Sequence, residues 1–403
     1  MIGAHRLVRL AKFGYWLDDR IGCYFADLIG DFVNFAFSPE QEELRRSVRR
    51  FLEDKSPSSE VRRLMETENG YDSVVWTLLA SQLGLVGLAI PEAYGGSGYG
   101  SVELGIVFEE MGRALYCGPY FSTVALAANA IMNCADESAN AEFLPAIAAG
   151  EAIAALAITE DDGSWDISSI ATTASRGEDG WALSGSKSYV IDAMVADIIV
   201  VAARSAAGLS VFVVASDAPN MEITPIPTLD TTRKMARISF TGTPASLIGE
   251  EGGGSAALER TLDMACVALA SEQVGGASRC LEMSVDYAKS RIQFGRPIGS
   301  FQAIKHKCAD MLVEVESARS AAYYASWVAD QDGDELSIAA PLAKAFCSDA
   351  YFSAAADTIQ IHGGIGFTWE HDAHLYFKRA KASQLLFGDA SYHRERLATK
   401  VGI

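Results

Sequence analysis

The hydrophobic pattern of this 403-residue chain changes twice along its length, and few folds accommodate both changes. Residues 38–152 carry apolar side chains at helical spacing. Residues 153–250 instead contain short β-branched runs separated by turn residues, and residues 251–403 return to a helical pattern. The sequence therefore predicts a mainly α protein with a central β-domain: an N-terminal helical domain, a small β-barrel or sandwich, and a C-terminal four-helix bundle.

Local signals predict where individual elements lie. A helix is expected to begin at Ser38 and Pro39, because serine caps a first turn and proline fits the first helical position. In the middle part, strands are expected at residues 181–190, 197–204, 209–216, 221–226 and 236–242. In the last part, helices are expected at residues 255–290, 298–330, 336–361 and 370–401.

The balance of charge excludes one class of partner. The chain has 52 acidic and 33 basic residues, which gives it a net charge of −19. A surface this acidic is repelled by a nucleic-acid backbone, so non-specific nucleic-acid binding is excluded. A local cationic patch for a phosphorylated ligand remains compatible with this charge.

Two features bear on the cellular compartment. Residues 1–37 form an N-terminal extension of unknown role, in which Asp18, Asp19 and Arg20 interrupt the apolar residues. The extension therefore predicts neither a signal peptide nor a membrane span. The cysteines are dispersed without metal-ligand spacing, which predicts reduced thiols, a cytoplasmic protein and no metal site. They are Cys23, Cys117, Cys134, Cys266, Cys280, Cys308 and Cys347.

Two segments have the composition of anion-binding turns. The first, at residues 287–302, reads YAKSRIQFGRPIGSFQ and places Arg291 and Arg296 between two helical patterns. The second, at residues 360–367, reads QIHGGIGF, and its glycines let backbone amides approach an anionic ligand. Taken singly, the first could be a solvated loop and the second a simple helix stop.

Five segments, these two among them, resemble motifs of the acyl-CoA dehydrogenase family and occur in the family's order. They read IPEAYGGSGYGSVELGIVFEEMGRA, AITEDDGSWD, SGSKSYVIDAMVADIIVVAA, SRIQFGRPIGSFQAIKHKCADM and QIHGGIGF. The resemblance covers residues 38–403. It is nearest to bacterial members that act on branched or bulky acyl-CoA thioesters, including those with sterol side chains.

The resemblance implies an activity and a set of partners. FAD would be the cofactor, and the reaction would be α,β-dehydrogenation of an acyl-CoA to the 2-enoyl-CoA. Electrons would then pass to an electron-transfer flavoprotein. The chain would associate with itself as a dimer or tetramer, or with a homologous partner subunit.

The resemblance also implies roles for particular residues. Thr159 would hydrogen-bond the flavin ring, and Tyr189 would stack near it. Arg291 would reach the FAD pyrophosphate across a subunit interface, where its planar fork suits phosphate oxygens; the alternative for it is a surface salt bridge. The implied cofactor contacts are Thr159, Ser164 (or Trp165), Tyr189, Arg291, Gln293, Phe294, Gln302, Gln360, Gly363 and Gly364.

The catalytic base is where the sequence departs from the family pattern. Removal of the α-proton of a thioester requires a carboxylate in a dry pocket that raises its pKa. Alignment puts Phe387 at the usual base position, and the other position that the family uses is Ala265. Asp389 is therefore the predicted base, with a helix N-cap as its alternative role. Glu272, two turns from Ala265, is expected to lie too far along its helix.

Three functions follow from this departure. The first is a self-sufficient acyl-CoA dehydrogenase. The second is a base-deficient subunit of a hetero-oligomeric acyl-CoA dehydrogenase, which contributes cofactor contacts and structure. The third is a flavin oxidase or monooxygenase on the same fold, because a fold alone does not fix the reaction.

Overall fold

The structure is a computed structural model that describes residues 37–178, 180–331 and 333–403. The chain divides into two units, Met1–Ser38 and Pro39–Ile403, and the second contains the sheet and the helical bundle. The extension expected at residues 1–37 lies outside the described residues, apart from Phe37. Within the described ranges, no helix combines the length and the apolar character that crossing a membrane requires.

The first part of the second unit is helical, as predicted. Its first helix begins at Pro39, and Asp72 and Asp136 cap two later helices by accepting hydrogen bonds from first-turn backbone amides. The apolar stretch at residues 121–128 winds as a π-helix whose residues are all buried. The elements are α3 (Pro39–Lys55), α4 (Ser58–Met65), α5 (Ser73–Ser81), α6 (Ser101–Ala114), η3 (Phe121–Ala128), α7 (Asn129–Asn133) and α8 (Glu137–Ala148).

The central part is a small barrel. Its strands are β1 (Ala154–Ala157), β2 (Thr173–Gly177), β3 (Gly180–Ile191), β4 (Ile198–Arg204), β5 (Leu209–Ala215), β6 (Met221–Ile226) and β7 (Met235–Ile248). Pairing runs from β4 through β2, β3, β7 and β5 back to β4, so the sheet closes on itself. β1 adds to β4 in parallel, and β6 adds to β7. All five expected strands are confirmed, whereas β1 and β2 were not among them. The sequence of β2, TASRG, is mostly polar and exposed.

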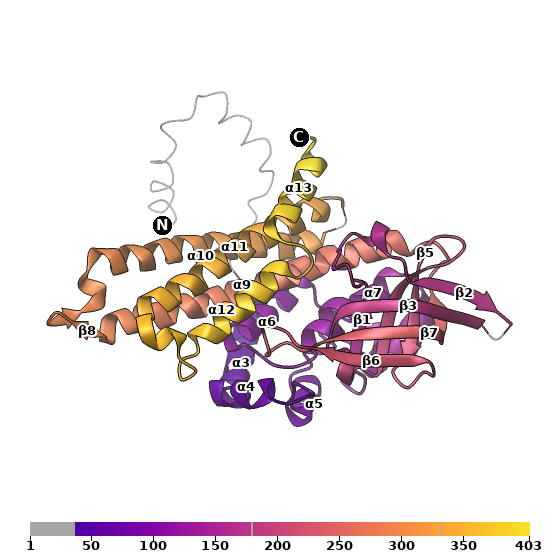
Figure 1. Ribbon diagram of the computed structural model, residues 1–403, viewed down its shortest axis with the longest axis horizontal. Coiled ribbons are helices and arrows are strands. Elements are labelled where there is room, and N and C mark those ends of the chain that lie inside the picture. Colours follow the sequence, from indigo (N-terminus) through magenta and orange to yellow (C-terminus); the bar gives the residue numbers. More distant parts are fainter. Residues whose placement is uncertain (1–36, 179, 332) are drawn as a thin grey trace. The chain divides into compact units, whose positions relative to one another are not determined.

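The last part is a helical bundle. It contains α9 (Gly254–Ser290), the hairpin strands β8 (Ile292–Gln293) and β9 (Arg296–Pro297), α10 (Gln302–Ala329), α11 (Leu336–His362), η7 (Gly363–Phe367), α12 (Ala373–Leu385) and α13 (Ala390–Val401). In Figure 1, α9, α10 and α11 run side by side, and each packs against the other two.

The prediction of a single helix over residues 370–401 is wrong. α12 ends at Leu385 and α13 begins at Ala390. Between them Phe387 and Gly388 have φ angles of +61° and +100°, which a right-handed helix cannot contain. Because of this break, Phe387 lies in the loop between α12 and α13.

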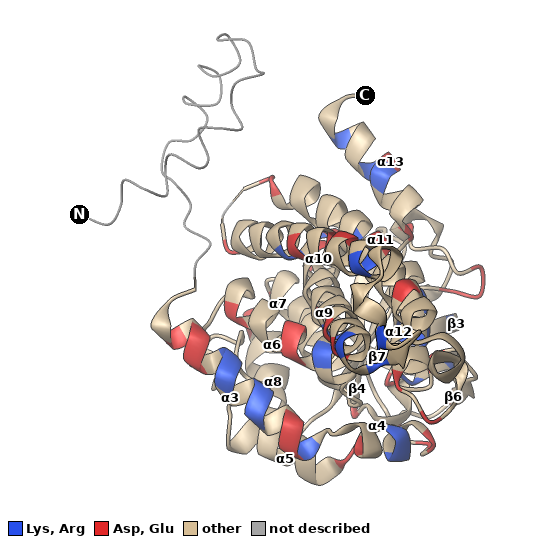
Figure 2. Cartoon of the chain, turned by 90° about the vertical axis from the view of Figure 1, so that its left-hand side faces the viewer, with Lys and Arg blue, Asp and Glu red and all other residues tan. Residues whose placement is uncertain are grey.

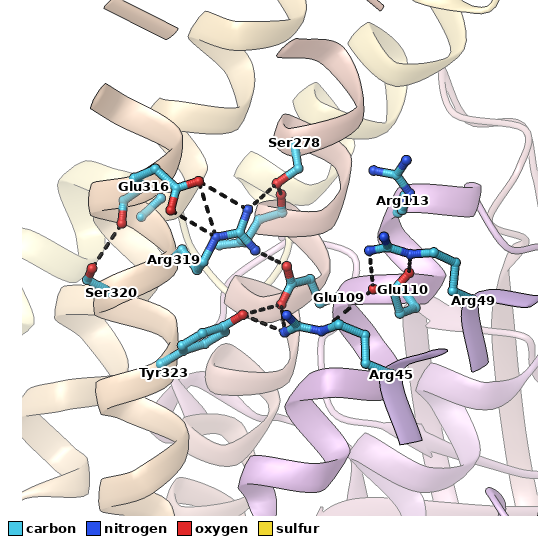
Figure 3. A network of polar contacts seen from close by, with 12 residues as sticks. Arg45, Arg49, Glu109, Glu110, Arg113, Ser278, Glu316, Arg319, Ser320 and Tyr323 are labelled. Atoms are coloured by element: carbon cyan, nitrogen blue, oxygen red, sulfur yellow. Dashed lines mark hydrogen bonds and ion pairs between the residues drawn. The ribbon is translucent and has the colours of Figure 1, made fainter. Parts of the chain in front are cut away.

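An ion-pair network ties the N-terminal helices to the bundle. Arg45 of α3 donates to Glu109 of α6 at 3.0 Å, and Arg319 of α10 also pairs with Glu109 (Figure 3). Arg49 bonds both oxygens of Glu110 at 2.8 and 2.7 Å. Figure 2 shows acidic residues near both ends of α3 and basic residues between them. Two of these arginines, Arg45 and Arg49, meet the carboxylates of Glu109 and Glu110 on α6. The network holds α3, α6 and α10 together.

Candidate active site

A small buried cavity lies between the barrel, η3 and the loop that precedes α13. We call it the β3 pocket, because the end of β3 forms one wall. Its volume of about 10 Å³ has room for about one water molecule. Its lining residues are Leu126, Leu156, Ile158, Thr159, Trp165, Ser188, Tyr189, Val190, Ile191 and Phe387.

Two residues that the sequence singled out, Thr159 and Tyr189, meet in the β3 pocket. Thr159 is 3% exposed, and its Oγ1 has no hydrogen-bond partner among the described residues. Tyr189 has a φ of +59° and is 40% exposed. A buried hydroxyl without a partner costs roughly 1–3 kcal/mol, so this wall suits a ligand with a hydrogen-bonding edge, such as a flavin ring. Ser164 does not line the pocket; its neighbour Trp165 does.

The loop that carries Thr159 is held by a buried lysine. Lys187 of β3 is fully buried, and its Nζ donates to the carbonyl oxygen of Ile158 at 2.8 Å and to Glu160 Oε1 at 2.9 Å. Burial lowers the pKa of Lys187 to about 8, and the nearby Glu160 carboxylate opposes this shift. The sequence analysis missed this residue, although a lysine at an inward-facing strand position was a signal that could have revealed it.

Aromatic side chains form another part of the β3 pocket lining, which includes Trp165 and Phe387. The Phe387 ring stacks on Phe121 with centroids 5.9 Å apart and an interplanar angle of 17°. Trp165 meets Phe387 edge-on at 5.0 Å. Phe387 therefore stands among apolar rings at the position where the resemblance leads us to expect a carboxylate.

A second buried lysine holds the loop that carries Phe387. Lys344 Nζ donates to the carbonyl oxygens of Gly388 and Gln384 at 3.0 and 3.2 Å. His393, also fully buried, has its Nε2 3.0 Å from the carbonyl oxygen of Phe387. Burial lowers the pKa of His393 to about 3, so the ring is neutral and Nε2–H donates to that carbonyl. These contacts fix the left-handed backbone at Phe387.

Asp389, the predicted base, lies outside the lining of the β3 pocket. Its side chain is exposed and accepts a hydrogen bond from the backbone N–H of Tyr392 at 2.8 Å, which caps α13. Ala265 is buried within α9. Among the described residues that line the pocket, none carries a carboxylate.

Glu272 is paired with two arginines rather than available as a base. Arg233 Nη2 donates to both Glu272 oxygens at 2.8 and 2.5 Å, and Arg379 Nη1 donates at 3.2 Å. Arg379 also bonds Asp230 at 2.6 Å. The Arg233 guanidinium lies 5.0 Å from the centroid of the Phe121 ring. This charged cluster therefore adjoins the aromatic ring that stacks on Phe387.

Asp192 is a further buried carboxylate near the site, and the sequence analysis missed it. It lines a second cavity, of about 20 Å³, together with Phe121 and Glu272. It accepts a hydrogen bond from Ser122 Oγ at 2.8 Å, and burial raises its pKa to about 7. Asp192 does not line the β3 pocket.

The remaining predicted contacts lie at the surface, away from the β3 pocket. The β8–β9 hairpin is exposed, and Phe294 at its tip is 91% exposed with a φ of +51°. The Gly-rich segment after α11 is exposed as well, and Trp369 beyond it is 64% exposed. The Tyr287 and His362 rings stack at 4.4 Å, which brings the ends of α9 and α11 together. Arg291, Gln293, Phe294, Gln302, Gln360, Gly363 and Gly364 thus belong to two exposed segments at the ends of adjacent helices.

Comparisons with known proteins agree with this fold. The N-terminal, middle and C-terminal domain models of acyl-CoA dehydrogenase match residues 38–151, 155–242 and 252–402. Acyl-CoA dehydrogenase IpdE2 of Mycobacterium tuberculosis is 36% identical over 362 residues, which are 90% of this chain and 97% of that protein.

Two solved structures are similar over nearly the whole fold. A chain of the Tcur3481–Tcur3483 steroid ACAD G363A variant is 32% identical with a TM-score of 0.83, over 90% of this chain and 98% of its own. A chain of the ChsE4–ChsE5 complex from Mycobacterium tuberculosis is 26% identical with a TM-score of 0.82, over 92% and 99%. The three-domain fold, the sequence identity and the three domain matches show that this chain belongs to the acyl-CoA dehydrogenase family.

Proposed function

We propose that this chain is the FAD-binding, base-deficient subunit of a hetero-oligomeric acyl-CoA dehydrogenase. The whole assembly would convert a branched or bulky acyl-CoA to the 2-enoyl-CoA in the cytoplasm and pass electrons to an electron-transfer flavoprotein. The observation that carries the proposal is Phe387, an aromatic residue at the position where α-proton removal needs a carboxylate. None of the described residues that line the pocket carries a carboxylate. The similar Tcur3481–Tcur3483 steroid ACAD variant and the ChsE4–ChsE5 complex are each named for two proteins, which supports a partner that supplies the base.

The residues of this chain would bind and orient the cofactor. FAD is the cofactor of the family and, when bound, accepts the β-hydride of the thioester. Thr159 offers an unpartnered hydroxyl to the flavin edge. On the exposed segments, Arg291 has the planar fork that pairs with phosphate oxygens, and Gln360 has a carboxamide that can bond the cofactor. These contacts need no base in this chain.

The proposal is tested by the visible spectrum of the purified chain. We expect the wild type alone to hold FAD but to keep its absorbance when CoA thioesters are added anaerobically. Phe387→Glu would restore a carboxylate inside the pocket, so we expect it to allow bleaching by at least one thioester. Phe387→Gln has the same size without the charge and serves as the matched control. Co-expression with a homologous acyl-CoA dehydrogenase chain that carries a base should restore bleaching to the wild type.

Two outcomes would contradict the proposal in different ways. Bleaching of the wild type alone, lost in Asp389→Ala with FAD retained, would establish a self-sufficient dehydrogenase that uses Asp389. Oxygen consumption by the thioester-reduced protein without any other acceptor would establish a flavin oxidase or monooxygenase instead.

A further inference from the structure

We infer that Lys187 is a positioning residue of this site: it holds the loop that carries Thr159 against β3 and so presents the unpartnered Thr159 hydroxyl to the flavin edge. The inference rests on the proposed binding of FAD with the flavin edge at the mouth of the β3 pocket, because the pocket itself has room for only about one water molecule. Lys187 itself does not line that pocket. It would act through Thr159 alone.

The geometry supports this role because the contacts fall on three consecutive residues. Lys187 Nζ donates to the carbonyl oxygen of Ile158 at 2.8 Å and to the carboxylate of Glu160 at 2.9 Å, one on each side of Thr159. The backbone N–H of Ser188 donates to the carbonyl oxygen of Thr159 at 2.8 Å. Residues 158–160 are therefore each bonded to either Lys187 or Ser188. With the backbone fixed in this way, the Thr159 side chain keeps its place in the pocket wall.

Glu160 extends this hold to a second segment of the barrel. Its two carboxylate oxygens accept hydrogen bonds from the backbone amides of Ala171 and Thr172 at 2.9 and 2.8 Å. Thr172 directly precedes β2, so the carboxylate joins the Thr159 loop to the segment that leads into β2. The carboxylate also compensates the charge of a fully buried ammonium, which would otherwise be costly in the interior.

The Thr159 loop makes two ion pairs with the sheet, one between Glu160 and Lys187 and the other between Asp161 and Arg237. Glu160 and, more weakly, Asp162 favour the charged form of Lys187. Asp161 instead pairs with Arg237 of β7 at 2.6 Å, and both of these side chains are largely exposed. The loop therefore has a buried ion pair with the sheet through Lys187 and an exposed one through Arg237. The exposed pair provides a matched control for the buried one.

A double-mutant cycle on cofactor binding tests the inference. The measurements are the FAD dissociation constant of the apoprotein and the visible spectrum of the bound flavin. We expect Thr159→Val and Lys187→Met each to weaken FAD binding about tenfold and to shift the flavin spectrum in the same way. Because Lys187 would act only through Thr159, the double variant should bind FAD about as weakly as the weaker single variant. Arg237→Met, at the exposed attachment, should change both measurements little.

Additive effects of the two substitutions, or unchanged binding and spectrum in Lys187→Met, would overturn the inference. If Lys187→Met does not fold, Glu160→Gln weakens the same attachment from its other end, and the cycle is run with that variant. The outcome does not depend on the proposed partner subunit, because FAD binding is measured rather than thioester bleaching. A base found in this chain would contradict the proposed function and leave this result standing.

Discussion

The two sides of the β3 pocket are each held by a buried lysine, but the two lysines have different partners. On the barrel side, Lys187 bonds one carbonyl and the carboxylate of Glu160. On the bundle side, Lys344 bonds the Ser348 hydroxyl and the carbonyls of Gln384 and Gly388, all of them neutral groups. Both lysines are fully buried. One charge is thus compensated by a direct ion pair and the other is not.

The difference shows two ways of keeping a cation inside a protein. Lys344 belongs to α11, but its ammonium group lies near the C-terminal end of α12. Unpaired carbonyls at that end carry partial negative charge and favour a cation. Lys187 has a full counter-charge, and the pair also joins separate segments of chain. Burial lowers the pKa of both lysines to about 8. We therefore expect similar titration but unequal losses of stability when each lysine is removed.

The largest effect is expected from Lys187→Met. This substitution leaves the half-buried carboxylate of Glu160 without its counter-charge, which should lower the free energy of unfolding by about 3 kcal/mol. Urea unfolding followed by circular dichroism measures this change. Adding Glu160→Gln to the variant should recover about 1 kcal/mol, because the uncompensated charge is then removed. A double variant less stable than Lys187→Met would show that the ion pair is not the main contribution.

A smaller loss is expected from Lys344→Met. Only neutral acceptors lose their donor, so the free energy of unfolding should fall by about 2 kcal/mol. The FAD dissociation constant should change less than in Lys187→Met, since the contacts of the Thr159 loop are untouched. The same unfolding and binding measurements decide the order of the two variants. A larger loss for Lys344→Met would mean that carbonyl contacts hold the Phe387 loop more strongly than the ion pair holds the Thr159 loop.

The two buried lysines should contribute stability that rises with pH just above neutrality, because both have lowered pKa values. Between pH 8 and about 9.5 the unfolded chain, with lysine pKa values near 10.5, binds more protons than the folded chain. Each lysine should therefore add about 1.5 kcal/mol to the free energy of unfolding over this window, whereas buried thiols such as Cys266 and Cys280, whose pKa burial raises to about 12, lower it. Subtracting the profile of Lys344→Met from that of the wild type isolates the contribution of Lys344. Above pH 10 buried tyrosines such as Tyr120, whose pKa burial raises, lower the free energy of unfolding further. A difference between the two profiles that stays flat from pH 8 to 9.5 would contradict the lowered pKa of Lys344.

The fold could be predicted from the sequence because hydrophobic periodicity over long segments shows which residues are buried. The five expected strands and the start of the first helix agree with the structure. The break between α12 and α13 escaped prediction because Phe387 is a non-glycine residue with a positive φ, held by Lys344 and His393 from elsewhere in the chain. The strand β2 escaped because its residues are mostly exposed and carry little hydrophobic signal.

The site was predicted only in part, for a related reason. Thr159 and Tyr189 were identified by resemblance, and the structure places both in one wall of the pocket. Lys187 and Lys344 could not be assigned from sequence, because their roles depend on carbonyl groups brought close by the tertiary fold. The resemblance placed Phe387 at the usual base position, yet its packing against Phe121 requires coordinates. Local pattern predicts which residues are buried better than it predicts which groups they meet.

The smallest effect, and the one that separates structure from chemistry, is expected at Asp389. Asp389→Ala removes the N-cap of α13 and should lower the free energy of unfolding by about 1 kcal/mol, whereas Asp389→Asn keeps a capping oxygen and should lose less. Neither variant should alter FAD binding, because Asp389 lies outside the pocket lining. If Asp389 is instead the base, both variants would abolish flavin bleaching by the chain alone, and Asp389→Asn would do so while retaining most of the stability. Anaerobic bleaching and urea unfolding of the same two variants therefore decide whether this carboxylate caps a helix or removes a proton.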